Sequence, residues 1–291
     1  MNATKQRDTG MKVGVMIFAT DQTMPMQRLA PEVEARGFDS LWVTEKTHVP
    51  VSRTTPWPGG ELPEWYRRTC DPFVALGAAA ATTTRLRIGT GVALLALRDP
   101  VIAAKTIATL DWQSAGRLEL GVGYGWNREE CATHGVDLDT VHHRLIDHVA
   151  LMRRLWADDE GSYSGDYCSV GPSWSWPKPV QQPAPPIHVG ARATSEVFDD
   201  IATWADGWLP IEGYGDVIDH LPRLRHAFEQ HDRDPETAVV SVYSSQGDPT
   251  LVAGYHEAGV DRVVVWLPPA DESTVLAALD THAHQLVEHL S

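Results

Sequence analysis

The chain has 291 residues, 43% hydrophobic and 22% charged, so it can bury a full globular core and is neither disordered nor fibrous. It carries 24 Lys and Arg against 39 Asp and Glu, and the resulting charge of −15 argues against nucleic acid and anionic membrane surfaces as partners. No apolar run approaches the ~20 residues that span a bilayer, and residues 1–10 lack the apolar core of a secretory signal. We therefore expect a cytoplasmic protein with a flexible tail over residues 1–10.

Short apolar, β-branched runs alternate with helical patterns along the rest of the chain. The predicted strands are 12–18, 40–44, 86–90, 118–123, 187–190, 207–210, 239–243 and 262–267, and helices are predicted at 24–36, 72–81, 100–110, 139–156 and 194–204 and after each of the last three strands. Continuous apolar strands are typical of parallel sheets that are buried on both faces. About eight strand–helix units predict an α/β protein with a single (β/α)8 TIM barrel over residues 11–291.

Two segments interrupt this alternation. Residues 46–69, which follow the second predicted strand, are rich in Pro and Gly and far exceed the usual length of a βα loop. We expect this long loop to form a lid over the barrel mouth. Residues 162–186 form an insertion before the fifth strand, with the pattern of a small hairpin or an extended segment, and carry Trp174 and Trp176. We expect the two segments to wall the substrate pocket together.

Metal and disulfide chemistry have little support in the sequence. The three cysteines Cys70, Cys131 and Cys168 are odd in number, widely spaced and form no CxxC motif. No histidine pair follows the first predicted strand, as a metal-dependent hydrolase of this fold would require. The sequence therefore predicts no metal site and no disulfide framework.

The carboxyl ends of the predicted strands are where a barrel of this kind places its chemistry. Glycine and aromatic residues dominate these ends, and this composition suits a flat aromatic ligand. Glu45, Glu129 and Glu212 could supply paired carboxylates for glycoside hydrolysis, although helix capping or arginine pairing explains each of them more simply. The segment VGARATSE (189–196) places a glycine turn and Arg192 before a helix, which suits a phosphate group. An ordinary connection with Thr194 or Ser195 as N-cap remains the alternative.

Several longer strings carry a family resemblance. They are GFDSLWVTE (37–45), YRRTCDPFVALGAAA (66–80), LRIGTGV (86–92), RDPVIAAKTIATLD (98–111), GRLELGVGYGWNREE (116–130), WSWPKPVQQPAPPIHVG (174–190) and ADGWLPI (205–211). Together they resemble the bacterial luciferase-like monooxygenase superfamily, and in particular its deazaflavin-dependent oxidoreductases that use coenzyme F420. The resemblance implies a barrel of the bacterial luciferase-like type that binds a flavin or deazaflavin ring at its carboxyl-terminal mouth. It also implies a homodimer.

The resemblance further assigns residues to the cofactor. The cofactor-binding positions are Phe18, Gly91, Val92, Ala93, Gly123, Tyr124, Gly125, Gly190, Ala191 and Arg192. Family members often carry a non-proline cis peptide at the end of the third strand, against which the ring lies. In this chain it maps to Gly91–Val92 or Val92–Ala93.

The candidate catalytic residues are Glu45, Lys46 and Trp126. Glu45 and Lys46 take the place of the family's acidic–histidine pair. Trp126 lies in the segment that holds a catalytic glutamate in the sugar-phosphate dehydrogenases. Because an indole cannot transfer a proton, sugar-phosphate oxidation is not expected.

These observations predict a coenzyme F420-dependent oxidoreductase that transfers a hydride to or from a small organic substrate. One alternative is an FMN-dependent monooxygenase that receives reduced flavin from a separate reductase. An alternative of another class is a non-catalytic flavin-binding barrel. Binding each purified cofactor and looking for turnover separates the three.

Overall fold

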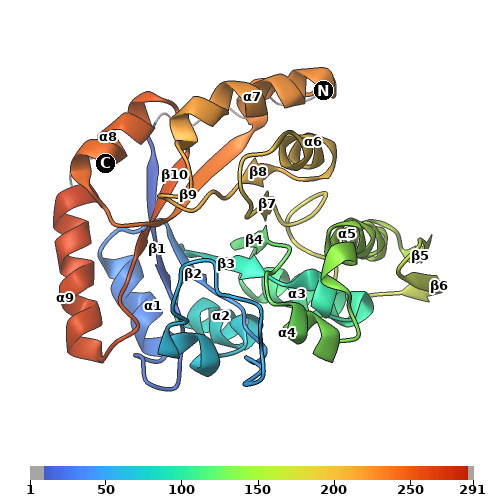
Figure 1. Cartoon of the computed structure of the whole chain (residues 1–291), viewed down its shortest axis with the longest axis horizontal. Helices are drawn as coiled ribbons and strands as arrows, with labels where there is room; N and C mark the ends of the chain where they lie inside the picture. Colours follow the sequence, from blue (N-terminus) through green and yellow to red (C-terminus); the bar gives the residue numbers. More distant parts are fainter. Residues whose placement is uncertain (1–9, 288–291) are drawn as a thin grey trace.

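The computed structural model describes residues 10–287. Within these residues, eight parallel strands close into one barrel (Figure 1). The expected tail over residues 1–10 lies outside the described residues apart from Gly10, as do residues 288–291 at the other end of the expected domain. In barrel order the strands are β1 (Lys12–Ile17), β2 (Ser40–Val43), β3 (Arg87–Ala93), β4 (Leu118–Val122), β7 (Ile187–Val189), β8 (Gly207–Trp208), β9 (Val239–Ser245) and β10 (Arg262–Trp266). The predicted (β/α)8 TIM barrel is confirmed.

Helices surround the barrel on its outside (Figure 1). They are α1 (Met26–Ala35), α2 (Pro72–Ala81), α3 (Pro100–Gln113), α4 (Arg128–Thr133), α5 (Val141–Ala157), α6 (Ser195–Trp204), α7 (Val217–Gln230), α8 (Pro249–Glu257) and α9 (Glu272–His282), with the short helical turns η1 (Glu64–Arg68), η2 (Leu95–Leu97), η3 (Leu138–Thr140), η4 (Pro235–Thr237) and η5 (Ala283–Val287). Asp–Pro pairs begin α2, α3 and α8, because the Asp carboxylate accepts the first free N–H groups and Pro needs no hydrogen bond in the first turn. This local chemistry explains why the predicted bounds of 72–81 match α2.

The two predicted interruptions are both present. The long loop after β2 contains η1, and a hairpin of β5 (Glu160–Ser164) and β6 (Ser169–Trp174) precedes the fifth barrel strand. The hairpin packs beside α5 at the edge of the molecule (Figure 1). Trp174 and Trp176 are 76% and 59% exposed there. The expectation that this insertion walls the substrate pocket is therefore wrong, because the hairpin turns outward over the helices.

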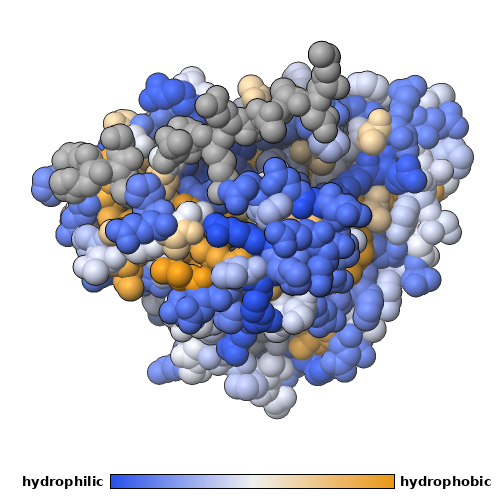
Figure 2. Space-filling model, turned by 90° about the horizontal axis from the view of Figure 1, so that it is seen from above, coloured by the Kyte–Doolittle hydropathy of each residue, from blue (hydrophilic) through white to orange (hydrophobic). Residues whose placement is uncertain are grey.

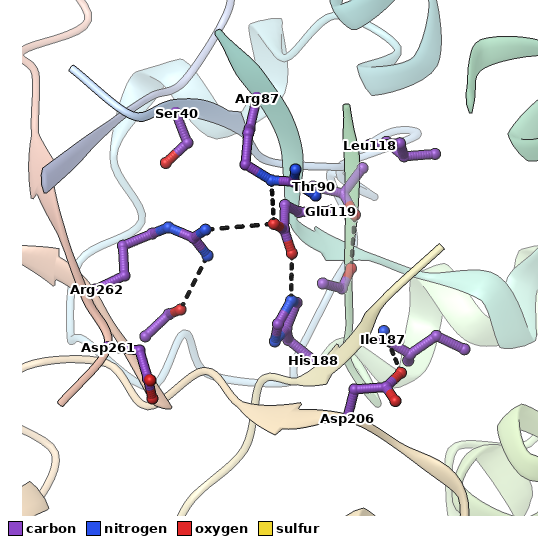
Figure 3. A network of polar contacts seen from close by, with 12 residues as sticks. Ser40, Arg87, Thr90, Leu118, Glu119, Ile187, His188, Asp206, Asp261 and Arg262 are labelled. Atoms are coloured by element: carbon purple, nitrogen blue, oxygen red, sulfur yellow. Dashed lines mark hydrogen bonds and ion pairs between the residues drawn. The ribbon is translucent and has the colours of Figure 1, made fainter. Parts of the chain in front are cut away.

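A buried network of charges fills the amino-terminal end of the barrel (Figure 3). Glu119 on β4 is 5% exposed, and its carboxylate pairs with Arg87 on β3 and Arg262 on β10. The His188 Nε2 atom lies 2.6 Å from the same carboxylate, and Arg262 Nε donates to Asp39 over 2.9 Å. Burial alone would raise the pKa of Glu119, but the charge of Arg262, the hydrogen bond with His188 and the charge of Arg87 outweigh it and hold this pKa well below its ordinary value.

Apolar and aromatic side chains fill the barrel interior next to this network. Met16, Trp42, Leu209 and Val264 pack there with Tyr243, and each is at most 4% exposed. The Arg262 guanidinium also lies 5.6 Å from the centre of the Trp42 ring. The charged network and the apolar interior thus meet at Trp42. The carboxyl-terminal end of the barrel remains available for a functional site.

The outside of the barrel is largely hydrophilic. Figure 2 shows one face on which hydrophilic side chains predominate and apolar ones gather in small patches between them. Some large apolar side chains are exposed, such as Val74 on α2 and Ile102 on α3, as is common on protein surfaces. Within residues 10–287, no helix combines the length and the apolar character that crossing a membrane requires.

We expect Glu119→Ala to lower the free energy of unfolding by about 3–5 kcal/mol, because it leaves buried arginine charges uncompensated. The measurement is urea unfolding followed by circular dichroism. Since the folded-state pKa of Glu119 lies below its unfolded value, its contribution is complete above the unfolded pKa and is lost as the pH falls. The difference between wild type and variant should therefore shrink in acid.

Glu32→Ala is the matched control for this prediction. Glu32 also pairs with an arginine, Arg36, but its side chain is 44% exposed. Exposed pairs of this type contribute about 0–1 kcal/mol. Equal losses for the two variants would contradict a special role for the buried network.

Candidate active site

A cavity of about 460 Å³ opens at the carboxyl-terminal end of the barrel. Its lining comes from the loop after β2 (Trp57, Pro58, Tyr66), the end of β3 (Gly91, Val92), the loop after β4 (Gly125, Trp126), the loop after β7 (Gly190 to Ala193), the segment from β8 into α7 (Trp208 to Ile211, Tyr214, Gly215, Val217, His220) and Tyr243 on β9. The volume suits a small organic molecule or the ring of a cofactor. The long loop after β2 therefore covers the barrel mouth, as predicted.

Glycines shape one wall of the cavity around Val92. The Gly91–Val92 peptide is cis, which confirms the first of the two predicted positions. A Cβ atom on Gly123 would lie 2.4 Å from Val92 Cγ2, and one on Gly190 would lie 2.4 Å from Val92 Cγ1. The Val92 side chain thus occupies the space that side chains at positions 123 and 190 would need, and glycine at both positions lets the ends of β3, β4 and β7 pack closely beside the cavity.

Tyr243 is a site residue that the sequence did not reveal. It is 4% exposed, and its hydroxyl has no hydrogen-bond partner among the described residues. Burial raises the pKa of Tyr243 well above its ordinary value. A Cβ atom on Gly91 would lie 2.3 Å from this hydroxyl. A buried, unpaired hydroxyl beside the cis peptide fits a site that a ligand completes.

Glu45 lies in an ion pair outside the cavity lining. It is 7% exposed, and its carboxylate accepts 2.6 Å hydrogen bonds from Arg98 Nε and from the Leu94 amide. Burial raises the pKa of Glu45, although the Arg98 charge opposes this. Arg98 also pairs with Asp71, the N-cap of α2. Glu45 therefore ties β2 to the starts of α2 and α3.

Lys46 is also turned away from the cavity. Its ammonium pairs with Glu130 on α4, and both side chains are at most 2% exposed. The Lys46 Nζ atom lies 4.6 Å from the centre of the Trp126 ring, and Trp126 itself lines the cavity. Of the three predicted catalytic residues, only Trp126 faces the cavity. The other two support the wall behind it.

Four predicted cofactor-binding residues lie outside the described lining: Phe18, Ala93, Gly123 and Tyr124. Phe18 packs beneath Tyr66 with ring centres 4.8 Å apart, and Ala93 is fully buried. Tyr124 donates a 3.0 Å hydrogen bond to Asp200 on α6. Neighbouring residues at a strand end point to opposite sides, so a contiguous stretch of sequence cannot all face one ligand.

Arg192 lies exposed at the rim of the cavity, 5.3 Å from the centre of the Tyr214 ring. It forms no ion pair with any described residue. Thr194 is the N-cap of α6, with its hydroxyl accepting from the Val197 amide over 3.2 Å. The Arg192 guanidinium is therefore available to an anion at the start of a ten-residue helix.

The carboxylates considered for glycoside hydrolysis serve separate structural contacts. Glu129 accepts hydrogen bonds from the amide and hydroxyl groups of Thr54 and Thr55, which fixes the long loop to α4. Glu212 accepts from the Ser245 hydroxyl over 2.7 Å. No group of three or more His, Cys, Asp or Glu in the described part of the chain is placed to hold a metal ion.

Comparison with known proteins identifies the family. The family model described as luciferase-like monooxygenase matches residues 11–262. The chain belongs to the luciferase-like monooxygenase family. Members of this family are oxidoreductases and monooxygenases, so this class is also that of the chain.

Two relatives are similar over most of the chain. An uncharacterized protein of Mycobacterium tuberculosis is 37% identical over 280 residues, which cover 95% of this chain and 99% of that protein. The F420-dependent glucose-6-phosphate dehydrogenase of Amycolatopsis mediterranei is 32% identical over 246 residues, which cover 82% and 68%.

Solved structures share the fold at lower identity. Monooxygenase RslO1 from Streptomyces bottropensis superposes with a TM-score of 0.79 at 21% identity, covering 97% of this chain and all of that one. The coenzyme F420-dependent tetrahydromethanopterin reductase from Methanopyrus kandleri gives 0.74 at 16% identity, with the same coverage. These likenesses support the barrel architecture.

We expect Gly91→Ala to lower the free energy of unfolding by about 1–3 kcal/mol, because the new methyl group collides with the Tyr243 ring. Urea unfolding measures the loss. Gly77→Ala is the control: Gly77 lies inside α2 with nothing within 4 Å of its Cβ position, so this variant should gain about 0.4–1 kcal/mol. A neutral Gly91→Ala would show that the contact is easily relieved.

Proposed function

We propose that this luciferase-like protein is a coenzyme F420-dependent oxidoreductase that transfers a hydride to or from a small organic substrate at the barrel mouth. The observation that carries the proposal is the surface of the cavity at Gly91, Val92 and Gly190, with the buried and unpaired Tyr243 hydroxyl beside it. Such a surface suits the face of a planar ring. The 32% identity to an F420-dependent dehydrogenase supports a deazaflavin over FMN.

The residues that would hold the cofactor lie on both sides of Val92. The backbone of Gly91 and Val92 would support the ring, and the Gly190 and Ala191 amides with Arg192 would bind its phosphate at the start of α6. When bound, the deazaflavin supplies two-electron hydride chemistry. The protein orients the ring and excludes water through the loop after β2.

The cavity argues against a sugar phosphate as substrate. Trp126 faces the cavity and cannot transfer a proton, while Glu45 and Lys46 are both engaged in ion pairs behind the wall. The substrate of the Amycolatopsis relative is therefore not carried over to this chain. A hydride acceptor with a C=C, C=N or nitro group fits the proposal instead.

We expect coenzyme F420 to bind much more tightly than FMN. Fluorescence titration of the purified protein with each cofactor measures the two dissociation constants. Tighter FMN binding would replace the proposal with an FMN-dependent monooxygenase supplied by a separate reductase. Cofactor binding without turnover of any substrate would indicate a flavin-binding barrel.

We expect Arg192→Ala to weaken F420 binding by roughly 10-fold or more, because a charge-assisted contact to phosphate contributes about 1.5–3 kcal/mol. Arg28→Ala serves as the control, since Arg28 is exposed and pairs with Glu272 on α9. The two variants change the protein's net charge equally. Unchanged affinity in Arg192→Ala would place the phosphate elsewhere.

A further inference from the structure

Three aromatic side chains from two loops face one another at the cavity. The centre of the Tyr66 ring lies 5.5 Å from that of Trp57 and 6.5 Å from that of Trp126. All three line the cavity, and the Tyr66 ring also packs at a tilt against the Phe18 ring. Planar apolar molecules bind well between such rings. We call Trp57, Tyr66 and Trp126 the aromatic wall.

The Tyr66 hydroxyl can donate a hydrogen bond into the cavity. Its oxygen interacts with the Trp57 side chain, and an indole N–H can only donate, so Tyr66 is the acceptor in that contact. The hydroxyl proton of Tyr66 therefore remains for another partner. Tyr66 is half-buried and lines the cavity, so that partner can be a bound molecule.

The described cavity lining next to the aromatic wall contains no charged side chain that could pair with a charged ligand. Glu45, Lys46 and their partners are paired behind the wall. Among the described lining residues, Arg192 and His220 are the only basic side chains, both lie on the α6 and α7 side, and none is acidic. A charged group placed against the aromatic wall would lose its hydration without finding a counter-ion.

We propose that the aromatic wall binds a planar, uncharged, conjugated carbonyl compound whose carbonyl oxygen accepts a hydrogen bond from Tyr66. This inference rests on the proposed function and names its substrate class. When bound in its reduced form, the deazaflavin would supply a hydride to the β-carbon of the substrate. The enolate oxygen that results takes the Tyr66 proton, and the phenolate regains a proton from water. The product is the saturated carbonyl compound after the enol tautomerises.

The surroundings of Tyr66 keep it protonated at neutral pH. Burial raises the pKa of Tyr66, the Trp57 hydrogen bond opposes this, and Tyr214 raises it further, so that it lies above its ordinary value. Tyr243 is the other titratable group that interacts with it. Tyr66 therefore holds the proton that its role requires.

The first test compares two molecules of the same shape, benzylideneacetone and cinnamate. They differ in that a methyl ketone replaces a carboxylate. Calorimetry on the protein, with and without oxidised F420, should show the ketone binding at least about 10-fold more tightly. Tyr66→Phe should weaken ketone binding about 3- to 10-fold. Tyr167→Phe, on the turn of the β5–β6 hairpin, should leave it unchanged.

The second test follows the oxidation of reduced F420 by benzylideneacetone in a single turnover. Tyr66→Phe should slow this step about 100-fold or more and abolish its solvent isotope effect, while the dissociation constant of F420 stays unchanged. Trp57→Phe keeps the Tyr66 hydroxyl and should slow the step only several-fold. If Tyr66→Phe does not fold, the comparison of benzylideneacetone with cinnamate on the wild-type protein still tests the inference.

The outcomes separate the inference from the proposed function. Equal or tighter binding of cinnamate, or an unchanged rate in Tyr66→Phe, overturns the inference while F420 binding still stands. Failure of wild-type protein to bind F420 overturns the proposed function. Ketone binding to the cofactor-free protein then still tests the aromatic wall.

Discussion

The carboxylate of Glu119 is the centre on which the barrel depends. On β4, at the amino-terminal end, it pairs with arginines on β3 and β10 and lies within hydrogen-bond distance of His188 on β7, where a lone charge would be very costly. Because these groups neutralise one another, strands from different parts of the chain are held in one register. At the carboxyl-terminal end the buried charges lie behind the cavity wall, and several glycines line the cavity itself.

Buried charges near the cavity are also paired with opposite charges. Glu45 with Arg98 and Lys46 with Glu130 form ion pairs behind the lining, so the charged residues near the mouth stabilise loops and helices. The described cavity lining is left with aromatic rings, aliphatic side chains, glycines, tyrosine hydroxyl groups and two basic side chains, Arg192 and His220. Such a site has little acid–base or metal chemistry of its own, which is why its proposed activity relies on a bound cofactor for the hydride.

The predictions succeeded where local patterns carry the information. Apolar runs located the barrel strands, Asp–Pro pairs located helix starts, and the cis peptide was placed within one bond of its position. They failed where a side chain's direction depends on distant parts of the chain. Trp174 turned outward with its hairpin, Tyr124 turned toward Asp200, and Tyr66 and Tyr243 were missed.

The sequence by itself determined the fold class, the family and the barrel end at which the site lies, because strand periodicity and motif order are properties of neighbouring residues. Tertiary structure alone decided which side chains line the cavity. Tyr66 and Trp126 are 60 positions apart, and their rings meet because Glu129 fixes the long loop to α4. A contact of this kind depends on how the chain closes in space, and no local spacing encodes it.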